Sequence, residues 1–477
     1  MKTPIIHQFI GKSTYNGERI YIDKALLTQA GFIPGTRFRT VTSTENNKIE
    51  FTVDHEGANK VSKKVRNQNS IPVIDKTGID IKGALKDCAH IKVTFVEGRV
   101  IIEGLKNTAT ILKENKHCTS DGELKTISFC AGTGISSQCL IEAGFKEIAS
   151  VEWNPKEGSE HKFSDIYVRN HPESIMFNLP MQLLDPNDLP YADVWVATLD
   201  CTDFSKASNG TKKEFQTMHL FMHLMRLFWG KEQSERPVSI LFENVGEFEK
   251  VAGVSLELCL KEEGFSVTRT KIDSLDYGSR TKRERFFMVA SIFEGFCFPE
   301  PTGRNKNSIE EDGVLSIDEL EWITPDESDT LKYFLTREDK GITHNHYMTM
   351  FDISKDAYVG TITKSHHKIQ PENWIKHPTI PNNFAYLKGN HIRALHGISE
   401  DYYLGDSNKL VVESIGQSVC LQTFKAIAQR LYKFLLKNLN SLMKRDQENI
   451  HTNNHFHKNL ITDDIFTIED SGQLAML

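Results

Sequence analysis

Reactive side chains stand at the ends of three apolar runs that are predicted to be strands. Cys201 follows the first run and lies among aspartates, which argues against a cysteine that only fills a core. Glu243 ends the second run, where a carboxyl group can protonate or orient a group in a cleft. Arg283 and Arg285 alternate into the third run. This arrangement suits a grip on a phosphate or a base, although a solvated charge run has the same pattern.

A glycine-containing turn precedes these segments. Residues 129–134 lead from a predicted strand into a helix that starts near Ser136, and the two glycines allow positive φ and a close backbone approach. The helix N-terminus offers N–H groups to a carboxylate or phosphate. About 20 residues further on, Glu152 and Trp153 end another strand, and a carboxylate there suits a ribose diol. Taken alone, the pattern fits a nucleotide site and a plain strand-to-helix turn equally well.

From residue 124 onward, apolar strand runs alternate with helical patterns. The alternation predicts an α/β fold in which a mainly parallel sheet has helices on both faces. Residues 298–385 break the alternation because they are polar and irregular, and helix periodicity returns at 391–436. The predicted strands are 125–130, 147–151, 193–198, 238–243 and 285–290.

Several segments, taken in order, resemble the motifs of the DNA cytosine-5 methyltransferase family. The resemblance covers residues 125–436, about two-thirds of the chain, and its specificity lies in the order and spacing of the motifs. It implies a Rossmann-like class I S-adenosylmethionine-dependent methyltransferase with a mixed, mainly parallel sheet, a small target-recognition domain and an N-terminal β-rich domain. The matching segments are 129–134 (FxGxG) with Glu152 as the next acid, 200–202 (PCQ), 243–245 (ENV), 281–285 (QxRxR), 361–367 (the end of the target-recognition region), 392–398 and 416–419 (GNSV).

The resemblance implies methyl transfer from S-adenosyl-L-methionine to C5 of cytosine in double-stranded DNA, after the target base has flipped out of the duplex. Cys201 would attack C6 as the nucleophile. Glu243 would contact N3 and the exocyclic amine, and Arg285, with Arg283 nearby, would hold the flipped nucleotide. No metal is expected, and the residues implied around the cofactor are Phe129, Cys130, Ala131, Gly132, Thr133, Gly134, Glu152, Trp153, Asn178, Gln417 and Ser418.

Several positions depart from the family pattern. Asp200 takes the place of the proline before the nucleophile, and a carboxylate beside a thiol raises the thiol pKa. Thr202 and Thr281 replace glutamines, Cys130 replaces an aromatic residue, and Asn178 replaces an aspartate. The departures leave three alternatives open: a methyltransferase-like DNA-binding protein with impaired catalysis, an RNA (tRNA) cytosine-5 methyltransferase, and an enzyme that transfers a different group from a modified cofactor.

Residues 1–105 are β-rich, and a strand–helix–glycine–strand–turn–strand layout occurs in them twice. The layout resembles the swapped-hairpin DNA-binding domains of the AbrB/MazE/SymE type, and a tandem pair would form within one chain what that family builds from two. Residues 1–116 hold 19 Lys and Arg against 12 Asp and Glu, although the whole chain carries a net charge of −7. A basic region fits contact with DNA, and a small β-domain with a solvated basic surface fits as well.

The other boundaries follow from composition. Residues 106–123 are polar and predict a linker, and the catalytic domain comprises 124–297 and 386–440. Between its two parts lies the target-recognition region, 298–385. Candidates for base readout in and next to this region are Arg304, Lys306, Lys364 and Lys368. The polar tail, 441–477, is predicted to be mobile, and metal binding is the alternative for its histidines, His451, His455 and His457.

Composition excludes several classes of protein. Hydrophobic residues make up 39% and charged residues 25%, which is ordinary for a soluble protein, and no run approaches the roughly 18 apolar residues of a membrane-spanning helix. The eight cysteines include no CxxC pair, so neither a disulfide framework nor a zinc ribbon is expected. The N-terminal residues lack the apolar core of a secretory signal. We expect a cytoplasmic, nucleoid-associated enzyme that acts as a monomer on DNA, away from membranes, with a cognate restriction endonuclease as a candidate partner.

Overall fold

The computed structural model describes residues 5–12, 19–66, 69–88, 90–115, 122–154, 161–201, 219–339 and 349–442. The chain divides into two compact units. The N-terminal unit comprises Met1–Glu114 and Glu262–Gly264, and the C-terminal unit comprises Asn115–Lys261 and Phe265–Leu477.

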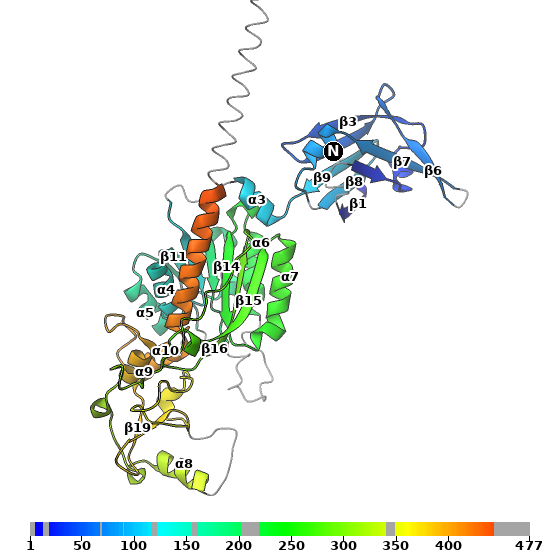
Figure 1. Ribbon diagram of the computed structural model, residues 1–477. Coiled ribbons are helices and arrows are strands. Elements are labelled where there is room, and N and C mark those ends of the chain that lie inside the picture. Colours follow the sequence, from blue (N-terminus) through cyan, green and yellow to red (C-terminus); the bar gives the residue numbers. More distant parts are fainter. Residues whose placement is uncertain are drawn as a thin grey trace, which may run out of the picture. The chain divides into compact units, whose positions relative to one another are not determined.

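The N-terminal unit contains two antiparallel sheets, the short helices α1 and α2, and most of α3 (Figure 1). One sheet has the strand order β1-β8-β9-β4-β3-β5 and the other the order β2-β7-β6. Aromatic side chains such as Phe32, Phe38 and Phe51 fill the core. The elements are β1 (Ile5–Lys12), β2 (Arg19–Ile22), α1 (Leu26–Gln29), β3 (Arg37–Ser43), β4 (Lys48–Val53), β5 (Asn59–Lys60), β6 (Ser62–Arg66), β7 (Asn69–Thr77), α2 (Ile79–Ala84), β8 (His90–Val96) and β9 (Arg99–Leu105).

Two hairpins of the N-terminal unit have matching spacing, and the predicted tandem arrangement of residues 1–105 stays a prediction. Phe38 pairs with Val53 in the hairpin β3–β4, and His90 pairs with Leu105 in the hairpin β8–β9, so equivalent positions lie 52 residues apart. Equivalent strands also pair with each other, because β2 pairs with β7 and β4 pairs with β9, both antiparallel. Strands from the first half of the unit thus pair with strands from its second half. The middle of the second copy, which was predicted to be irregular, contains α2.

Part of the predicted linker is helical. Helix α3 (Thr108–Asn115) lies within 106–123, and its apolar residues Ala109 and Leu112 are buried on one face. The polar composition of the segment therefore concealed a short amphipathic helix.

The C-terminal unit is built on a seven-stranded sheet of order β12-β11-β10-β13-β14-β16-β15 (Figure 1). Its first five strands are parallel, and β16 runs antiparallel to both of its neighbours. The predicted fold class, with a mixed and mainly parallel sheet, is confirmed, and all five predicted strands are present. The strands are β10 (Lys125–Phe129), β11 (Lys146–Val151), β12 (Ile175–Phe177), β13 (Val194–Ala197), β14 (Ser239–Asn244), β15 (Ser266–Asp273) and β16 (Glu284–Ser291).

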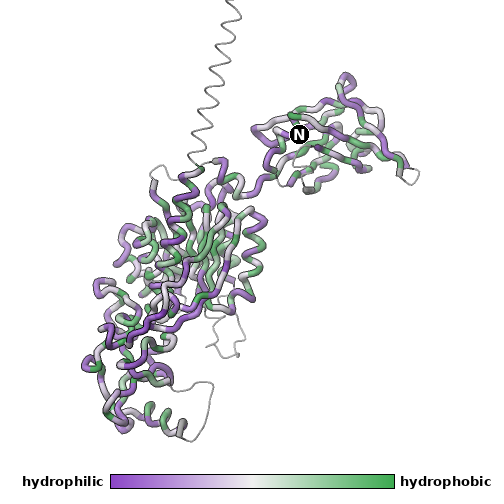
Figure 2. Tube along the Cα trace, viewed as in Figure 1, coloured by the Kyte–Doolittle hydropathy of each residue, from purple (hydrophilic) through white to green (hydrophobic). Residues whose placement is uncertain are grey.

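Helices cover both faces of this sheet. They are α4 (Ile135–Ala143), α5 (Lys162–Asn170), α6 (Leu220–Gly230) and α7 (Val254–Glu262). On one face, Trp195 of β13 packs between Phe129 of β10 and Phe228 of α6. On the other face, Ser137 of α4 donates a hydrogen bond to Ser128 of β10. Figure 2 shows the hydrophobic residues gathered along the central strands, which carry the long apolar runs expected of strands buried on both faces.

Short elements make up the target-recognition region and the closing segment. The sheet β17-β18-β19 and α8 enclose a small core of Leu331, Trp374 and Phe384. The predicted helix periodicity at 391–436 is confirmed by α9, α10 and a helix over residues 421–442. The elements are α8 (Asp329–Asp339), β17 (Met350–Phe351), β18 (Trp374–Lys376), β19 (Phe384–Tyr386), α9 (Gly389–His396) and α10 (Asn408–Gln417). The C-terminal unit also contains the π-helix η5 (Glu249–Gly253) and the short 3-10 helices η2 (Met181–Leu183), η3 (Pro186–Asp188), η4 (Gln233–Glu235), η6 (Ser274–Asp276), η7 (Ile317–Glu319), η8 (Pro325–Glu327) and η9 (His366–Lys368). Among the described residues, none of the helices is both long and apolar enough to traverse a bilayer.

Candidate active site

The candidate site lies where the strand order of the large sheet changes direction. From β10 the sheet continues through β11 to β12 on one side and through β13 to β14 on the other. At such a point the carboxyl ends of two neighbouring parallel strands leave a crevice. Phe129 and Ala197, the last residues of β10 and β13, are partners in register. The sheet therefore brings the glycine turn and the cysteine segment to the same edge.

The cysteine segment is held by the neighbouring strand β14. Asn244, a buried residue, donates a hydrogen bond from Nδ2 to the carbonyl of Leu199 over 2.9 Å, two residues before Cys201. Its Oδ1 accepts the Val245 N–H over 2.8 Å, which orients the amide from its other side. Asn244 was not among the predicted site residues. Its position directly after Glu243 is the sequence signal that could have identified it. Thr202 and Asp203 of this segment lie outside the described residues.

Cys201, Glu243 and Arg285 form a cluster that we call the thiol site. Arg285 Nε lies 3.3 Å from Glu243 Oε1, and the two side chains are 14% and 9% exposed. Burial raises the pKa of the Cys201 thiol; Arg285 opposes this effect, and the carboxylates of Glu243 and Asp200 add to it. Burial also raises the pKa of Glu243, against the attraction of Arg285 and Arg283. The sheet thus assembles a nucleophile, a carboxyl group able to carry a proton, and a cation.

Arg283 is buried and bound to the backbone. Its guanidinium is buried and donates to three backbone carbonyls, those of Ile362 at 3.3 Å, Gly416 at 3.3 Å and Ser418 at 2.6 Å. Burial and the neighbouring Arg285 lower the pKa of Arg283. Because the three carbonyls belong to the end of the target-recognition region and to the C-terminal end of α10 with the residue after it, Arg283 ties both segments to β16.

The residues before Arg283 add further links to the target-recognition region. Val359 N–H donates to Arg280 O over 2.9 Å, and Lys282 N–H donates to Val359 O over 3.0 Å. The Arg280 side chain donates to the carbonyls of Asn307 and Ala357 and pairs with Asp312. Residues 280–283 therefore connect the large sheet to the target-recognition region.

The glycine turn adopts the strained geometry that its sequence allows. Cys130, Gly132 and Gly134 have φ values of 55°, 58° and 87°, in the left-handed region that glycine tolerates best. Glu152 Oε2 accepts the Gly132 N–H over 2.7 Å, so the predicted ribose-binding acid also fixes the turn. Burial and the Glu152 carboxylate raise the pKa of the Cys130 thiol.

The other predicted cofactor residues surround the same edge of the sheet. Trp153 follows Glu152 and is 36% exposed, and Asn178 lies after β12, where its Oδ1 is 3.2 Å from Ser164 Oγ. Gln417 ends α10 and is exposed, and the carbonyl of Ser418 is a partner of Arg283. The role of these residues around the cofactor stays a prediction.

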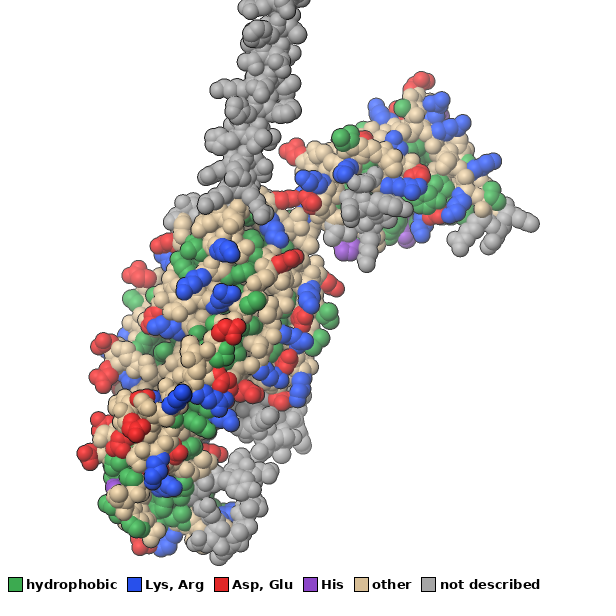
Figure 3. Space-filling model, viewed as in Figure 1, with side chains coloured by type: hydrophobic (Ala, Val, Ile, Leu, Met, Phe, Trp, Pro, Cys, Tyr) green, Lys and Arg blue, Asp and Glu red, His purple; other side chains and the backbone are tan. Residues whose placement is uncertain are grey.

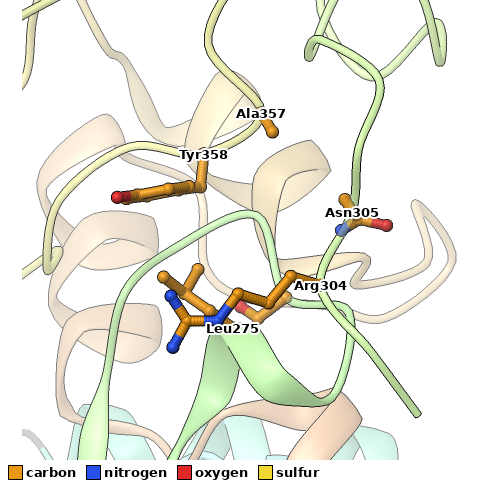
Figure 4. Close-up of a pocket in the computed structure, with 6 residues that line it drawn as sticks. Leu275, Arg304, Asn305, Ala357 and Tyr358 are labelled. Carbon is orange, nitrogen blue, oxygen red and sulfur yellow. The ribbon is translucent and has the colours of Figure 1, made fainter.

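The readout candidates differ in their surroundings. Arg304 is held by Asp276 at 2.7 Å and by Asp273 at 3.5 Å, whereas Lys306, Lys364 and Lys368 are exposed. A cavity of about 60 Å³ lies beside Arg304, with Leu275 near the guanidinium and Tyr358 on the opposite wall (Figure 4). The carboxylates that pair with Arg304 leave it poorly placed to bind an additional anion.

Comparison with known proteins agrees with this fold and site. The C-5 cytosine-specific DNA methylase family matches residues 124–433. The type II methyltransferase M.NlaX of Neisseria lactamica is 24% identical over 262 residues, which are 52% of this chain and 78% of that protein. M.MspI of Moraxella sp is 24% identical over 272 residues, 56% of this chain and 61% of that protein.

Two solved structures share the fold. The Dnmt2 methyltransferase of S. pombe has 16% identity and a TM-score of 0.51, covering 67% of this chain and 100% of its own. The Entamoeba histolytica methyltransferase EhMeth has 15% identity and a TM-score of 0.52, covering 66% and 99%. The C-terminal unit therefore has the Rossmann-like fold of S-adenosylmethionine-dependent methyltransferases. The chain belongs to the C-5 cytosine-specific DNA methylase family, and its enzyme class is DNA (cytosine-5-)-methyltransferase.

Proposed function

We propose that this protein methylates C5 of cytosine in double-stranded DNA, with the target base flipped out and bound covalently through Cys201. The observation that carries the proposal is the thiol site, in which Cys201, Glu243 and Arg285 meet at the switch point of the sheet. The carbon C5 of cytosine is not nucleophilic by itself. Addition of a thiolate at C6 makes C5 enamine-like, which is the chemical need that a cysteine at this edge answers.

The three side chains of the thiol site have distinct tasks in this scheme. Cys201 Sγ forms the bond to C6 and leaves again when the C5 proton is lost. Glu243, whose pKa is raised by burial, is suited to hold a proton at N3 of the ring while charge moves onto it. Arg285 favours the thiolate form of Cys201 and lies beside Glu243, where it can hold the flipped nucleotide.

The residues of the glycine turn fit the family's cofactor. Nothing lies within 4 Å of the position that a Cβ on Gly132 would take, so a ligand can approach this backbone closely. Glu152 offers a carboxylate for a ribose diol, and the partly exposed Trp153 ring offers a flat face for an adenine. S-Adenosyl-L-methionine, when bound, supplies the methyl group. The named residues bind and orient it next to the thiol site.

We further propose that both units contact the duplex. The resemblance of the N-terminal unit to swapped-hairpin DNA-binding domains stays a prediction, supported by the matching spacing of its two hairpins and by its excess of Lys and Arg. Figure 3 shows Lys and Arg side chains spread over the visible face of this unit. Because one chain holds both halves, the unit needs no second copy, which supports action as a monomer. A cognate restriction endonuclease and a nucleoid-associated place in the cytoplasm remain part of the proposal.

Two alternatives give different results in one assay. We expect labelled methyl groups from S-adenosylmethionine to enter duplex DNA, and mass analysis of the nucleosides to find them in 5-methylcytosine. Label in tRNA but not in DNA would indicate the RNA enzyme, and a DNA-binding protein that transfers no label would indicate an impaired enzyme. Neither alternative is favoured by the relatives, which are type II methyltransferases.

The substitution of Asp200 for the family's proline has a testable electrostatic consequence. The Asp200 carboxylate contributes to the raised pKa of Cys201, so kcat/KM should rise with pH as the thiol ionises. Asp200→Asn removes one negative charge and lowers the thiol pKa, so the rising limb should move to lower pH when measured between about pH 6 and 10. Asp188→Asn removes the same charge at an exposed position in η3, 13 residues before Cys201, and should leave the limb in place because Asp188 is not among the charges that act on the Cys201 thiol. Coincident profiles for wild type and Asp200→Asn would contradict the assignment.

A further inference from the structure

The buried side chains of Tyr402 and His171 contact backbone carbonyls of the glycine turn and belong to none of the matching motif segments. Tyr402 O–H donates to the carbonyl of Thr133 over 2.7 Å. His171 Nε2 lies 3.0 Å from the carbonyl of Gly134 and 3.1 Å from Tyr402 Oη. Both side chains are at least nine-tenths buried.

The hydrogen-bond chemistry fixes the tautomer of His171. The hydroxyl proton of Tyr402 is used on Thr133, and a carbonyl cannot donate, so His171 must carry its proton on Nε2 and share it between Gly134 O and Tyr402 Oη. Burial lowers the pKa of His171, which keeps the imidazole neutral. Two neighbouring carbonyls of the turn are therefore each held by a buried donor.

A second set of contacts fixes Tyr402 itself. Asn170, the last residue of α5, donates from Nδ2 to Tyr403 O over 2.8 Å and accepts Tyr403 N–H on Oδ1 over 2.9 Å, as a neighbouring strand would. The Arg169 guanidinium lies 3.8 Å from the centroid of the Tyr403 ring. The end of α5 thus binds the segment after α9 through both backbone polar groups of Tyr403 and through its ring. We call Asn170, His171 and Tyr402 the turn lock.

The glycine turn packs so closely against His171 that Gly134 could not carry a side chain. A Cβ on Gly134 would lie 2.6 Å from the His171 ring and 2.9 Å from Tyr167, and the φ of 87° is itself unsuited to other residues. Because a trans peptide points its C=O and N–H in opposite directions, holding Gly134 O against His171 aims the Ile135 N–H away from the lock. Ile135 is the first residue of α4, and the backbone N–H groups of a helix N-terminus can donate to an anionic or polar ligand.

We propose that Tyr402 and His171 are positioning residues for the S-adenosylmethionine site, which they serve by holding the two carbonyls of the glycine turn. The inference rests on the proposed function, because it takes the glycine turn as the cofactor site. It makes cofactor affinity depend on a segment more than 200 residues away in the chain, while DNA contact and the thiol site are left unchanged.

The test compares Tyr402→Phe with Tyr403→Phe in the full-length protein. Tyr402→Phe leaves Thr133 O without its donor, and we expect the Kd for S-adenosylhomocysteine and the KM for S-adenosylmethionine to rise about tenfold, with kcat within about twofold and DNA affinity unchanged. Tyr403→Phe keeps the ring that Arg169 contacts and should behave as wild type. His171→Gln, which retains an N–H donor, should bind the cofactor more tightly than His171→Leu.

The outcomes separate this inference from the proposed function. A Tyr402→Phe protein that melts at a lower temperature but binds S-adenosylhomocysteine as wild type does would reduce the lock to a structural role and overturn the inference. A wild-type protein that binds no S-adenosylhomocysteine would instead overturn the cofactor assignment on which the inference depends.

Discussion

Cys201→Ala should lower methyl transfer by about 10⁴-fold or more while the protein still binds DNA and S-adenosylhomocysteine within about threefold of wild type. The reason is that C5 becomes nucleophilic only after a bond to C6 has formed, and neither Glu243 nor Arg285 can form that bond. The substitution removes a half-buried thiol and leaves the ion pair between Arg285 and Glu243 in place. Transfer of labelled methyl groups and filter binding of DNA measure the two properties separately.

The control for this substitution is another cysteine of the same unit. Cys297 is exposed and lies after β16, so Cys297→Ala should retain wild-type turnover. Turnover by Cys201→Ala above a few per cent of wild type would mean that the reaction does not pass through this thiol.

Arg283→Met should destabilise the C-terminal unit by about 3 kcal/mol or more and lower activity by about 100-fold. Removal of the guanidinium leaves the buried carbonyls of Ile362, Gly416 and Ser418 without their donor. These carbonyls belong to segments next to the proposed base and cofactor sites. A shift of these segments should therefore disturb both proposed sites. Arg283→Lys should lie between wild type and methionine, since a single ammonium group cannot serve three separate carbonyls.

Arg269→Met is the matched control. Arg269 on β15 pairs with Glu249 and Glu257, but its side chain is 33% exposed, and exposed ion pairs contribute at most about 1 kcal/mol. Urea denaturation followed by circular dichroism should find a much smaller loss for Arg269→Met than for Arg283→Met. Equal losses would show that the buried carbonyl contacts of Arg283 are not the reason for its effect.

The thiol site was predictable because each of its members carries a local signal. Cys201 and Glu243 stand at or beside the carboxyl ends of parallel strands, which meet at one edge of an α/β sheet. Arg285 lies at the start of β16, which runs antiparallel to β14 and therefore begins at that same edge. Their order along the chain matched a family pattern. Neither step needed knowledge of contacts between distant residues.

The contacts of Arg283 and of the turn lock were not predictable in this way. Arg283 was expected near the flipped base because of its place in the motif, but its carbonyl partners lie 79 to 135 residues further along the chain. Tyr402 and Thr133 are 269 residues apart. Backbone carbonyls are present at every residue, so no sequence pattern marks which of them a buried side chain will reach.

The missed strands have simpler explanations. Strand β12 has three residues, too few for alternation to be visible. Strand β15 lies at the sheet edge and carries Arg269 and Lys271, charges of the kind that protect an exposed edge from pairing and that also weaken its apolar pattern. In the N-terminal part of the chain, the helical pattern of α3 was hidden by its polar residues.

The most direct test of the central claim is covalent trapping on duplex DNA that contains 5-fluorocytosine. Fluorine at C5 cannot leave as a proton does, so elimination of the cysteine is blocked after methyl transfer and the enzyme stays attached to C6. With S-adenosylmethionine present, wild type should form a denaturant-resistant adduct whose cross-linked peptide contains Cys201, and Cys201→Ala should form none. An active wild-type enzyme that gives no adduct, or an adduct at another residue, would contradict the proposed mechanism.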